Sequence, residues 1–293
     1  MLTNTKFQFV TTEDSSLTAR IGAPGLPKEE CSEAMHSLRG AFSETVYIYG
    51  TAIERAFASI RPENAGAPEK VNARVLSMGL GLGYVELLSA ALALRFDVPV
   101  RGESFEIVPE LREYFLAWLS GGDLPPDFAQ AYDAICARTA SEVSSRMAAG
   151  RTMSYLTGGA GTSEANEHAN NGDVNGNGNG KTQALSAAEV KRALAMAVAD
   201  GAWLIREELT ATTEFKGKFG CICFDAFSSK TTPDLWSEEF LGAFFQKTAD
   251  VACVLSTYAC TGALKRALKA EGFVITIREG FSSKRDSTFA VRN

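Results

Sequence analysis

Three glycines at alternate positions, Gly79, Gly81 and Gly83, end a short apolar run and precede an apolar helical pattern. A strand, a glycine turn and a helix in this order form the first unit of an open α/β sheet. Glycine has no Cβ, so the backbone at these positions can approach a ligand closely. The spacing is G-x-G-x-G, whereas a loop that binds a dinucleotide pyrophosphate reads G-x-G-x-x-G. It favours a ligand without a pyrophosphate, such as S-adenosylmethionine; the alternative is a glycine-rich turn that binds nothing.

Three acidic residues, Glu106, Asp200 and Asp225, are each expected at the end of an apolar strand. In an open α/β sheet, ligands bind beyond the carboxyl ends of the strands, so these acids and the glycines are predicted to surround one nucleoside-sized ligand. An acid at the position of Glu106 accepts hydrogen bonds from ribose hydroxyls. We expect Asp200 to hold the adenine amino group or a neighbouring backbone amide. A single acid at a strand end can instead cap a helix or a turn.

These residues need a sheet to bring them together, and alternating strands and helices predict one. The expected strands occupy residues 74–78, 98–106, 194–199, 220–224, 251–257, 273–277 and 288–291. The expected helices occupy residues 84–95, 109–119, 128–147, 187–192, 202–209, 233–245 and 262–270. Such alternation predicts an α/β fold with a Rossmann-like, mainly parallel sheet that helices cover on both faces.

The predicted sheet domain is expected to carry an N-terminal extension and an internal insertion. Residues 1–60 form a predicted N-terminal extension, with a β-hairpin over 7–21, a β-rich run at the end of 33–49 and a short helix over 53–60. Residues 61–293 form the predicted sheet domain, with a flexible insertion over about 120–190. Within the insertion, residues 158–180 are rich in Gly, Asn, Ser and Thr and cannot bury a core, so we expect an exposed, mobile loop there.

The composition narrows the classes of protein. The chain has 293 residues and a net charge of −6, although residues 261–293 carry seven basic against three acidic residues. This local excess predicts either a phosphate-contacting patch or a solvated face. The six cysteines show no C-x-x-C spacing and there are only two histidines, so no metal site is expected. No signal peptide or membrane span is found in the sequence, which predicts a cytoplasmic protein.

Four segments carry a resemblance to a known family: residues 35–47, 77–85, 225–236 and 281–285. They are similar to an opening Gly-Glu-aromatic motif, a G-x-G-T-G-x-N loop, a D-[AG]-F-[AS]-P-x-K-N-P-[DE]-[LM]-W segment and a terminal G-x-x-x-K-R element. These motifs are found in the methyltransferase half of the bifunctional bacterial enzyme that finishes 5-methylaminomethyl-2-thiouridine in tRNA, and in its stand-alone relatives. The resemblance implies a class I methyltransferase sheet, S-adenosyl-L-methionine as cofactor and tRNA as partner.

The resemblance also implies roles for side chains. Asp225 would hold the substrate amine and accept its proton, since a protonated amine has no free lone pair. Glu44 and Tyr47 would close the pocket, and packing in the core is the alternative for Tyr47. The basic pair Lys284 and Arg285 would contact phosphate. A flavin-dependent step would belong to a separate oxidase acting upstream, because no oxidase half follows in this sequence.

The chain departs from the family pattern at four positions. Leu82 and Tyr84 stand where the glycine loop of the family has Thr and Asn, and Ser229 and Thr232 replace a Pro and an Asn. Three functions therefore remain open. They are methylation of the aminomethyl nitrogen on a tRNA wobble uridine, a small-molecule amine transfer on the same fold, and a non-catalytic relative that has lost cofactor binding.

Replacing residues 158–181 with a short Gly/Ser linker is expected to leave the melting temperature nearly unchanged, because a segment of this composition buries no core. Differential scanning calorimetry of the two proteins measures the difference. A fall of more than about 5 °C, at least about 1 kcal/mol for a domain of this size, would show that the segment packs.

Overall fold

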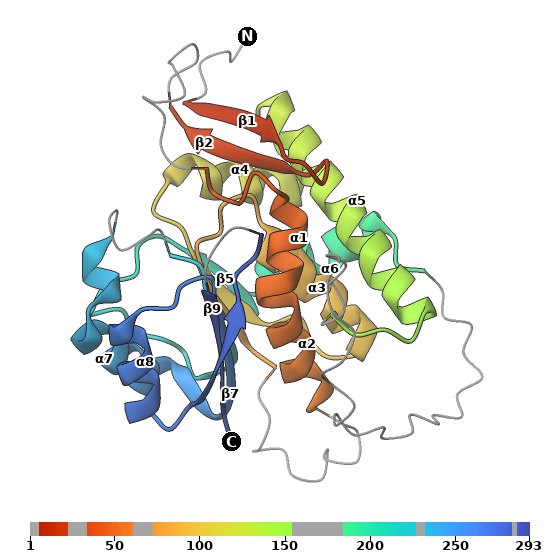
Figure 1. Cartoon of the computed structure of the whole chain (residues 1–293). Helices are drawn as coiled ribbons and strands as arrows, with labels where there is room; N and C mark the ends of the chain where they lie inside the picture. Colours follow the sequence, from red (N-terminus) through yellow and green to blue (C-terminus); the bar gives the residue numbers. More distant parts are fainter. Residues whose placement is uncertain (1–5, 23–33, 61–72, 154–183, 227–231, 283–285) are drawn as a thin grey trace.

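A seven-stranded sheet forms the centre of the computed structural model, which describes residues 6–22, 34–60, 73–153, 184–226, 232–282 and 286–293 (Figure 1). The strand order is β5-β4-β3-β6-β7-β9-β8. The strands are β3 (Val75–Met78), β4 (Gly102–Phe105), β5 (Trp203–Arg206), β6 (Phe219–Phe224), β7 (Ala249–Thr257), β8 (Val274–Glu279) and β9 (Asp286–Arg292).

Strands β3 to β7 pair in parallel, and β9 runs antiparallel between β7 and β8. Every residue of β3, β4 and β6 is buried, as expected for parallel strands covered on both faces. The predicted Rossmann-like α/β sheet is therefore confirmed.

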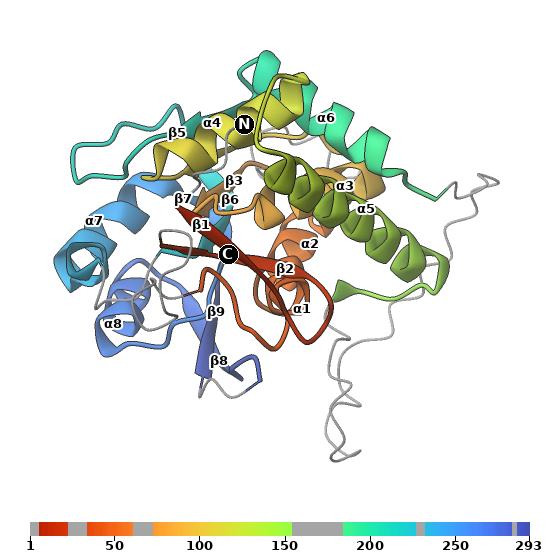
Figure 2. The same cartoon turned by 90° about the horizontal axis from the view of Figure 1, so that it is seen from above.

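Helices cover the two faces of the sheet unequally (Figures 1 and 2). One face carries α3 (Tyr84–Phe96), α4 (Pro109–Ser120), α5 (Pro126–Ala148) and α6 (Ala187–Ala199), and the other carries α7 (Glu238–Thr248) and α8 (Gly262–Ala270). Alternate residues of β6 enter different apolar clusters, because side chains of a strand point to opposite faces. Cys221 and Cys223 join the cluster under α3 to α6, whereas Ile222 and Phe224 join the cluster under α7 and α8.

The N-terminal extension contains the predicted hairpin, formed by β1 (Phe7–Thr11) and β2 (Leu17–Ile21). The prediction of a β-rich run before a short helix was wrong. Residues 41–58 are helical throughout, as α1 (Ala41–Thr45), the π-helical turn η2 (Val46–Gly50) and α2 (Thr51–Ala58). Hairpin and helices bury side chains in the same cluster as α3 to α6, so packing decides the conformation here against the β propensity of the run.

Three further expectations need correction. Residues 194–199 continue helix α6, and β5 lies where a helix was predicted over 202–209. Helix α5 is buried along one side, so residues 126–148 are no flexible insertion, and residues 158–180 lie outside the described residues. The predicted helix 233–245 is divided into the 3-10 helix η5 (Pro233–Trp236) and α7, whose N-cap is Ser237.

Asp14 joins the hairpin turn to the start of α1. One carboxylate oxygen accepts hydrogen bonds from Ser43 N at 3.0 Å and Ser43 Oγ at 2.6 Å, and the other accepts from Ser16 N at 3.0 Å and Thr12 Oγ1 at 2.7 Å. Arg138 of α5 donates to the Asp14 backbone carbonyl at 2.6 Å. Burial by itself would raise the pKa of Asp14, but the hydrogen bonds from Ser16, Ser43 and Thr12 outweigh it and hold the pKa far below its usual range.

Asp14→Ala is expected to lower the free energy of unfolding at pH 7 by roughly 1.5–3 kcal/mol, the scale of hydrogen bonds to a charged group. The folded-state pKa of Asp14 is depressed, so its contribution is present above the unfolded pKa of about 3.9 and is lost as the pH falls below it. Urea unfolding at neutral and acidic pH measures the difference, with the exposed loop acid Asp123→Ala as control. An equal cost of Asp14→Ala at both pH values would contradict the role of the charge.

Candidate functional site

The order in which the chain adds strands to the sheet reverses between β3 and β6, and the carboxyl ends of these two parallel strands lie side by side. Asp225 N donates to the Met78 carbonyl at 3.0 Å. Gly79 has φ of 98°, and a Cβ on it would lie 2.7 Å from the Asp225 carbonyl oxygen. Only glycine accepts both the positive φ and the close approach. In open α/β sheets this switch point is where ligands bind.

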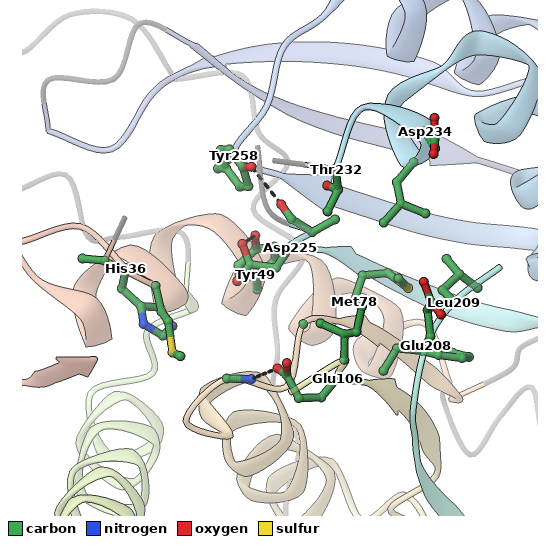
Figure 3. Close-up of a pocket in the computed structure, with 18 of the residues that line it drawn as sticks. His36, Tyr49, Met78, Glu106, Glu208, Leu209, Asp225, Thr232, Asp234 and Tyr258 are labelled. Carbon is green, nitrogen blue, oxygen red and sulfur yellow. Dashed lines mark hydrogen bonds between the residues drawn. The ribbon is translucent and has the colours of Figure 1, made fainter. Parts of the chain in front are cut away.

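A cavity of about 780 Å³ lies beyond these strand ends (Figure 3). Its wall comes from β2, from the segment before α1, from α1 and η2, and from the ends of β3, β4, β5, β6 and β7 with the residues that follow them. The volume lies within the usual range of pockets for small molecules and cofactors, about 300–1,000 Å³. Five of the residues predicted from the sequence line it: Glu44, Gly79, Gly81, Glu106 and Asp225.

Glu106 is buried at the end of β4 and holds two backbone segments in place. One carboxylate oxygen accepts from Gly81 N at 2.9 Å, and the other accepts from Val108 N at 2.9 Å. Burial raises the pKa of Glu106 above its usual value, while the two amides and Arg112 act in the opposite direction. The carboxylate therefore orders the glycine loop as well as facing the cavity.

The three glycines have different surroundings. A Cβ on Gly81 would point toward the cavity wall, 3.8 Å from Met35 Sδ and 4.0 Å from His36 Cε1. Gly83 does not line the cavity, contrary to the prediction, because a Cβ there would overlap the Phe115 ring of α4. Gly83 thus serves the packing of α3 on α4, and of the three glycines Gly79 and Gly81 line the cavity.

The two unusual residues of the glycine loop point away from the cavity. Leu82 is fully buried in the cluster under α3 to α6. Tyr84 donates its hydroxyl to the Leu17 carbonyl of the hairpin at 2.6 Å, and its ring meets His36 edge-on with centroids 4.8 Å apart. Tyr84 therefore fastens the glycine loop to the N-terminal extension, and neither Leu82 nor Tyr84 lines the cavity.

Asp225 is paired with a tyrosine that the sequence analysis missed. Tyr49, on η2, donates its hydroxyl to one carboxylate oxygen of Asp225 at 2.6 Å (Figure 3). Burial raises the pKa of Tyr49 well above its usual value, and the neighbouring Asp225 charge adds to the effect. Tyr258, after β7, donates to the Ala226 carbonyl at 2.8 Å and so holds the backbone next to Asp225.

The predicted substrate residues separate into three groups. Glu44 lines the cavity and accepts a hydrogen bond from Ser37 N at 2.6 Å. Tyr47 does not line it; its hydroxyl donates to the Glu279 carbonyl at 2.7 Å, which fits the packing alternative. Lys284 and Arg285 lie outside the described residues.

Asp200 lies at the wrong edge of the sheet for its predicted role. It is the C-cap of α6 and precedes β5, so it sits near the amino end of that strand. The residues that follow the carboxyl end of β5 are Glu207 and Glu208, and both line the cavity. The sequence contained a signal for helix α6, because Ser186 and Glu189 form the capping box at its start.

The charges around the cavity are mostly negative. Among the described residues its wall carries one arginine, Arg20, and six carboxylates: Glu44, Glu106, Glu207, Glu208, Asp225 and Asp234. Such a wall favours a cationic ligand over an anionic one. The described ranges contain no group of three or more His, Cys, Asp or Glu side chains able to hold a metal ion. In that same part of the chain no helix has both the length and the apolar character to span a membrane.

Comparisons with known proteins agree with this geometry. Residues 180–293 match the family of S-adenosyl-L-methionine-dependent methyltransferases. Over 67 residues the chain is 36% identical to the tRNA 5-methylaminomethyl-2-thiouridine biosynthesis bifunctional protein MnmC of Hahella chejuensis, a match that spans 23% of this chain and 10% of that protein. The crystal structure of MnmC2 from Aquifex aeolicus is similar over 99% of this chain and 71% of its own, with a TM-score of 0.53 and 18% identity.

The family match and the curated relative support an MnmC-like methyltransferase domain that depends on S-adenosyl-L-methionine, and they confirm the resemblance drawn from the motifs. The matched segment spans about a tenth of the length of the curated relative. The likeness to the Aquifex aeolicus structure shows the fold.

Gly81→Val is expected to abolish S-adenosyl-L-methionine binding, because the new side chain would project into the cavity. Isothermal titration calorimetry with the cofactor measures the loss. Gly121→Val is the matched control: Gly121 also has a positive φ and open space around its Cβ, but it lies at the end of α4, away from the cavity. Equal affinities of the two variants would exclude the glycine loop as the binding surface.

Proposed function

We propose that this chain transfers the methyl group of S-adenosyl-L-methionine to an amine nitrogen, namely the aminomethyl nitrogen on a wobble uridine of tRNA. The observation that carries the proposal is the position of Asp225. Its carboxylate stands at the switch point, in a wall of carboxylates and across from the glycine loop.

The residues around the glycine loop suit the proposed cofactor. When bound, S-adenosyl-L-methionine supplies an electrophilic methyl group on a positively charged sulfur. Gly81 leaves room for the methionine end, since a side chain there would project toward the cavity, and Gly79 lets the Asp225 backbone approach the end of β3. Glu106 would accept hydrogen bonds from the ribose hydroxyls, and Glu208, after β5, would take the adenine role predicted for Asp200.

Asp225 would perform the acid–base work. A protonated amine has no lone pair, so its proton must leave before or during attack on the methyl carbon. The nitrogen then forms the new N–C bond, the C–S bond breaks with its electron pair on sulfur, and the displaced proton goes to the carboxylate. Holding nitrogen and methyl group in line supplies much of the remaining rate.

The tRNA part of the proposal rests on the named activity of the Hahella chejuensis relative and on charge. Residues 261–293 carry an excess of basic residues, and Lys284 and Arg285 are proposed to meet phosphate. A separate flavin oxidase is proposed to provide the aminomethyl substrate.

A small-molecule amine is the second candidate substrate, favoured by the six carboxylates around the cavity and the net charge of −6. Incubation with labelled cofactor and either bulk tRNA lacking the modification or a panel of small amines decides between them. Label in tRNA, with binding that weakens as salt rises, supports the first candidate. Label only in amines supports the second, and no cofactor binding would indicate a non-catalytic relative.

Asp225→Asn is expected to lower turnover by about 10² to 10⁴, the usual contribution of a general base. The amide keeps the shape of the side chain but cannot accept the proton. Cofactor affinity should change little, because Gly79, Gly81 and Glu106 face the cofactor instead.

Steady-state turnover and calorimetric cofactor affinity are measured on the same protein. Asp234→Asn, another carboxylate of the cavity wall, should lose less turnover. Near-normal turnover of Asp225→Asn would reduce Asp225 to a turn cap, because Asn caps about as well as Asp. A parallel loss of turnover and affinity would show that Asp225 shapes the cofactor pocket.

A further inference from the structure

The π-helical turn η2 interrupts the helix that runs from α1 to α2. It spans Val46–Gly50, between two α-helical segments. Single π turns inside α-helices are rare and occur frequently at functional sites, because the wider turn redirects the side chains that follow. Here the turn carries Tyr49, which is 2% exposed and lines the cavity.

The sheet holds this turn from outside the cavity. Arg278 of β8 donates to the carbonyl of Ile48 at 3.1 Å and to that of Tyr47 at 3.4 Å. Ser256 of β7 also donates to the Ile48 carbonyl, and Arg278 donates to Ser256 Oγ at 2.9 Å. Two backbone carbonyls of η2 are thus bound by side chains from β7 and β8, the strands on either side of β9, which fixes the turn on the sheet.

The fixed turn presents the Tyr49 hydroxyl to Asp225 at 2.6 Å (Figure 3). The two residues come from elements 176 positions apart in the chain, so only the folded structure brings them together. A phenol that remains protonated is a donor, and a carboxylate is an acceptor, so the direction of this hydrogen bond is determined.

We propose that Tyr49 is a positioning residue for Asp225, held by the Arg278–Ser256 clamp on η2, and that it orients the carboxylate and keeps it ionised for the amine substrate. The proposal rests on the proposed amine methylation and adds a residue to it. Donation to the charged form of a carboxylic acid favours that form. Without the donor, the pKa of Asp225 must rise.

Other titratable groups face the pair and are common to all variants. Tyr258 lies beyond the end of β7, Glu44 on α1, and the buried Cys223 thiol on β6. Burial is the first cause that raises the pKa of Tyr49, followed by the charge of Asp225, so the phenol stays neutral throughout the pH range of an assay.

Tyr49→Phe removes the donor and keeps the ring, and Tyr47→Phe is the matched control on the same turn. The Tyr47 hydroxyl also makes one hydrogen bond, but to the Glu279 backbone and away from the cavity. Protein labelled with ¹³C at aspartate carboxyls and saturated with S-adenosyl-L-methionine is titrated by NMR, with Asp225→Asn assigning the resonance. Methyl transfer to undermodified tRNA is followed over the same pH range.

In Tyr49→Phe the pKa of Asp225 is expected to rise by about 1, and kcat/KM to fall roughly 10- to 100-fold, as for the loss of a hydrogen bond to a charged group. The acidic limb of the pH profile should move upward with the pKa, and cofactor affinity should be retained. Tyr47→Phe should keep the wild-type pKa of Asp225. Arg278→Lys, which loses the forked donor but keeps the charge, should raise that pKa by less than Tyr49→Phe does.

An unchanged Asp225 pKa in Tyr49→Phe overturns the proposal, as does a fall in cofactor affinity that matches the fall in kcat/KM. If Tyr49→Phe does not fold, Arg278→Lys carries the test, and an unchanged pKa there has the same meaning. Absence of methyl transfer to tRNA by the wild-type protein counts against the proposed function alone, because the NMR titration still decides the role of Tyr49.

Discussion

The carboxyl ends of β3 and β6 approach each other so closely that no side chain fits at position 79. The amide of Asp225 binds the last carbonyl of β3, and the amides of Gly79 and Leu80 bind the last carbonyl of β4. Three strand ends are therefore tied together by backbone hydrogen bonds before any ligand is considered. The chain leaves β3 and β6 toward opposite halves of the sheet, so a cavity forms beyond these joined strand ends. Glu106 and Asp225 line that cavity.

The pattern of apolar runs in the sequence predicted the residues at these strand ends. Gly79, Gly81, Glu106 and Asp225 each follow or end a short apolar run, and in a parallel sheet the ends of such runs share one edge. Where an apolar run was ambiguous, the prediction failed. The run over residues 194–199 is made of Ala, Leu, Met and Val, and three of these residue types favour a helix, so the run continues the helix that the capping box at Ser186 starts. Because this run was predicted to be a strand, Asp200 was predicted at the carboxyl edge of the sheet, whereas it lies near the amino end of β5.

Contacts between distant parts of the chain could not be predicted in this way. Nothing in the spacing of Tyr47 and Tyr49 tells which ring faces the cavity, because a π turn changes the angle between successive side chains. The answer depends on Arg278 and Ser256, more than 200 residues later. The same holds for Gly83, because its neighbour Phe115 lies on α4, which follows α3 and β4 in the chain. Tertiary packing, rather than a ligand, explains that glycine.

The hydrogen bond from the Tyr84 hydroxyl to the Leu17 carbonyl joins the glycine loop to the hairpin. A chimera that received a glycine loop with Asn at position 84 would lose the hydrogen bond from Tyr84 to the Leu17 carbonyl. The His36 ring would also lose the contact with Tyr84. Every residue at position 17 has a backbone carbonyl, so only the contact between the Tyr84 and His36 rings can make substitutions on the two sides depend on each other, and through His36 that contact reaches the cavity wall.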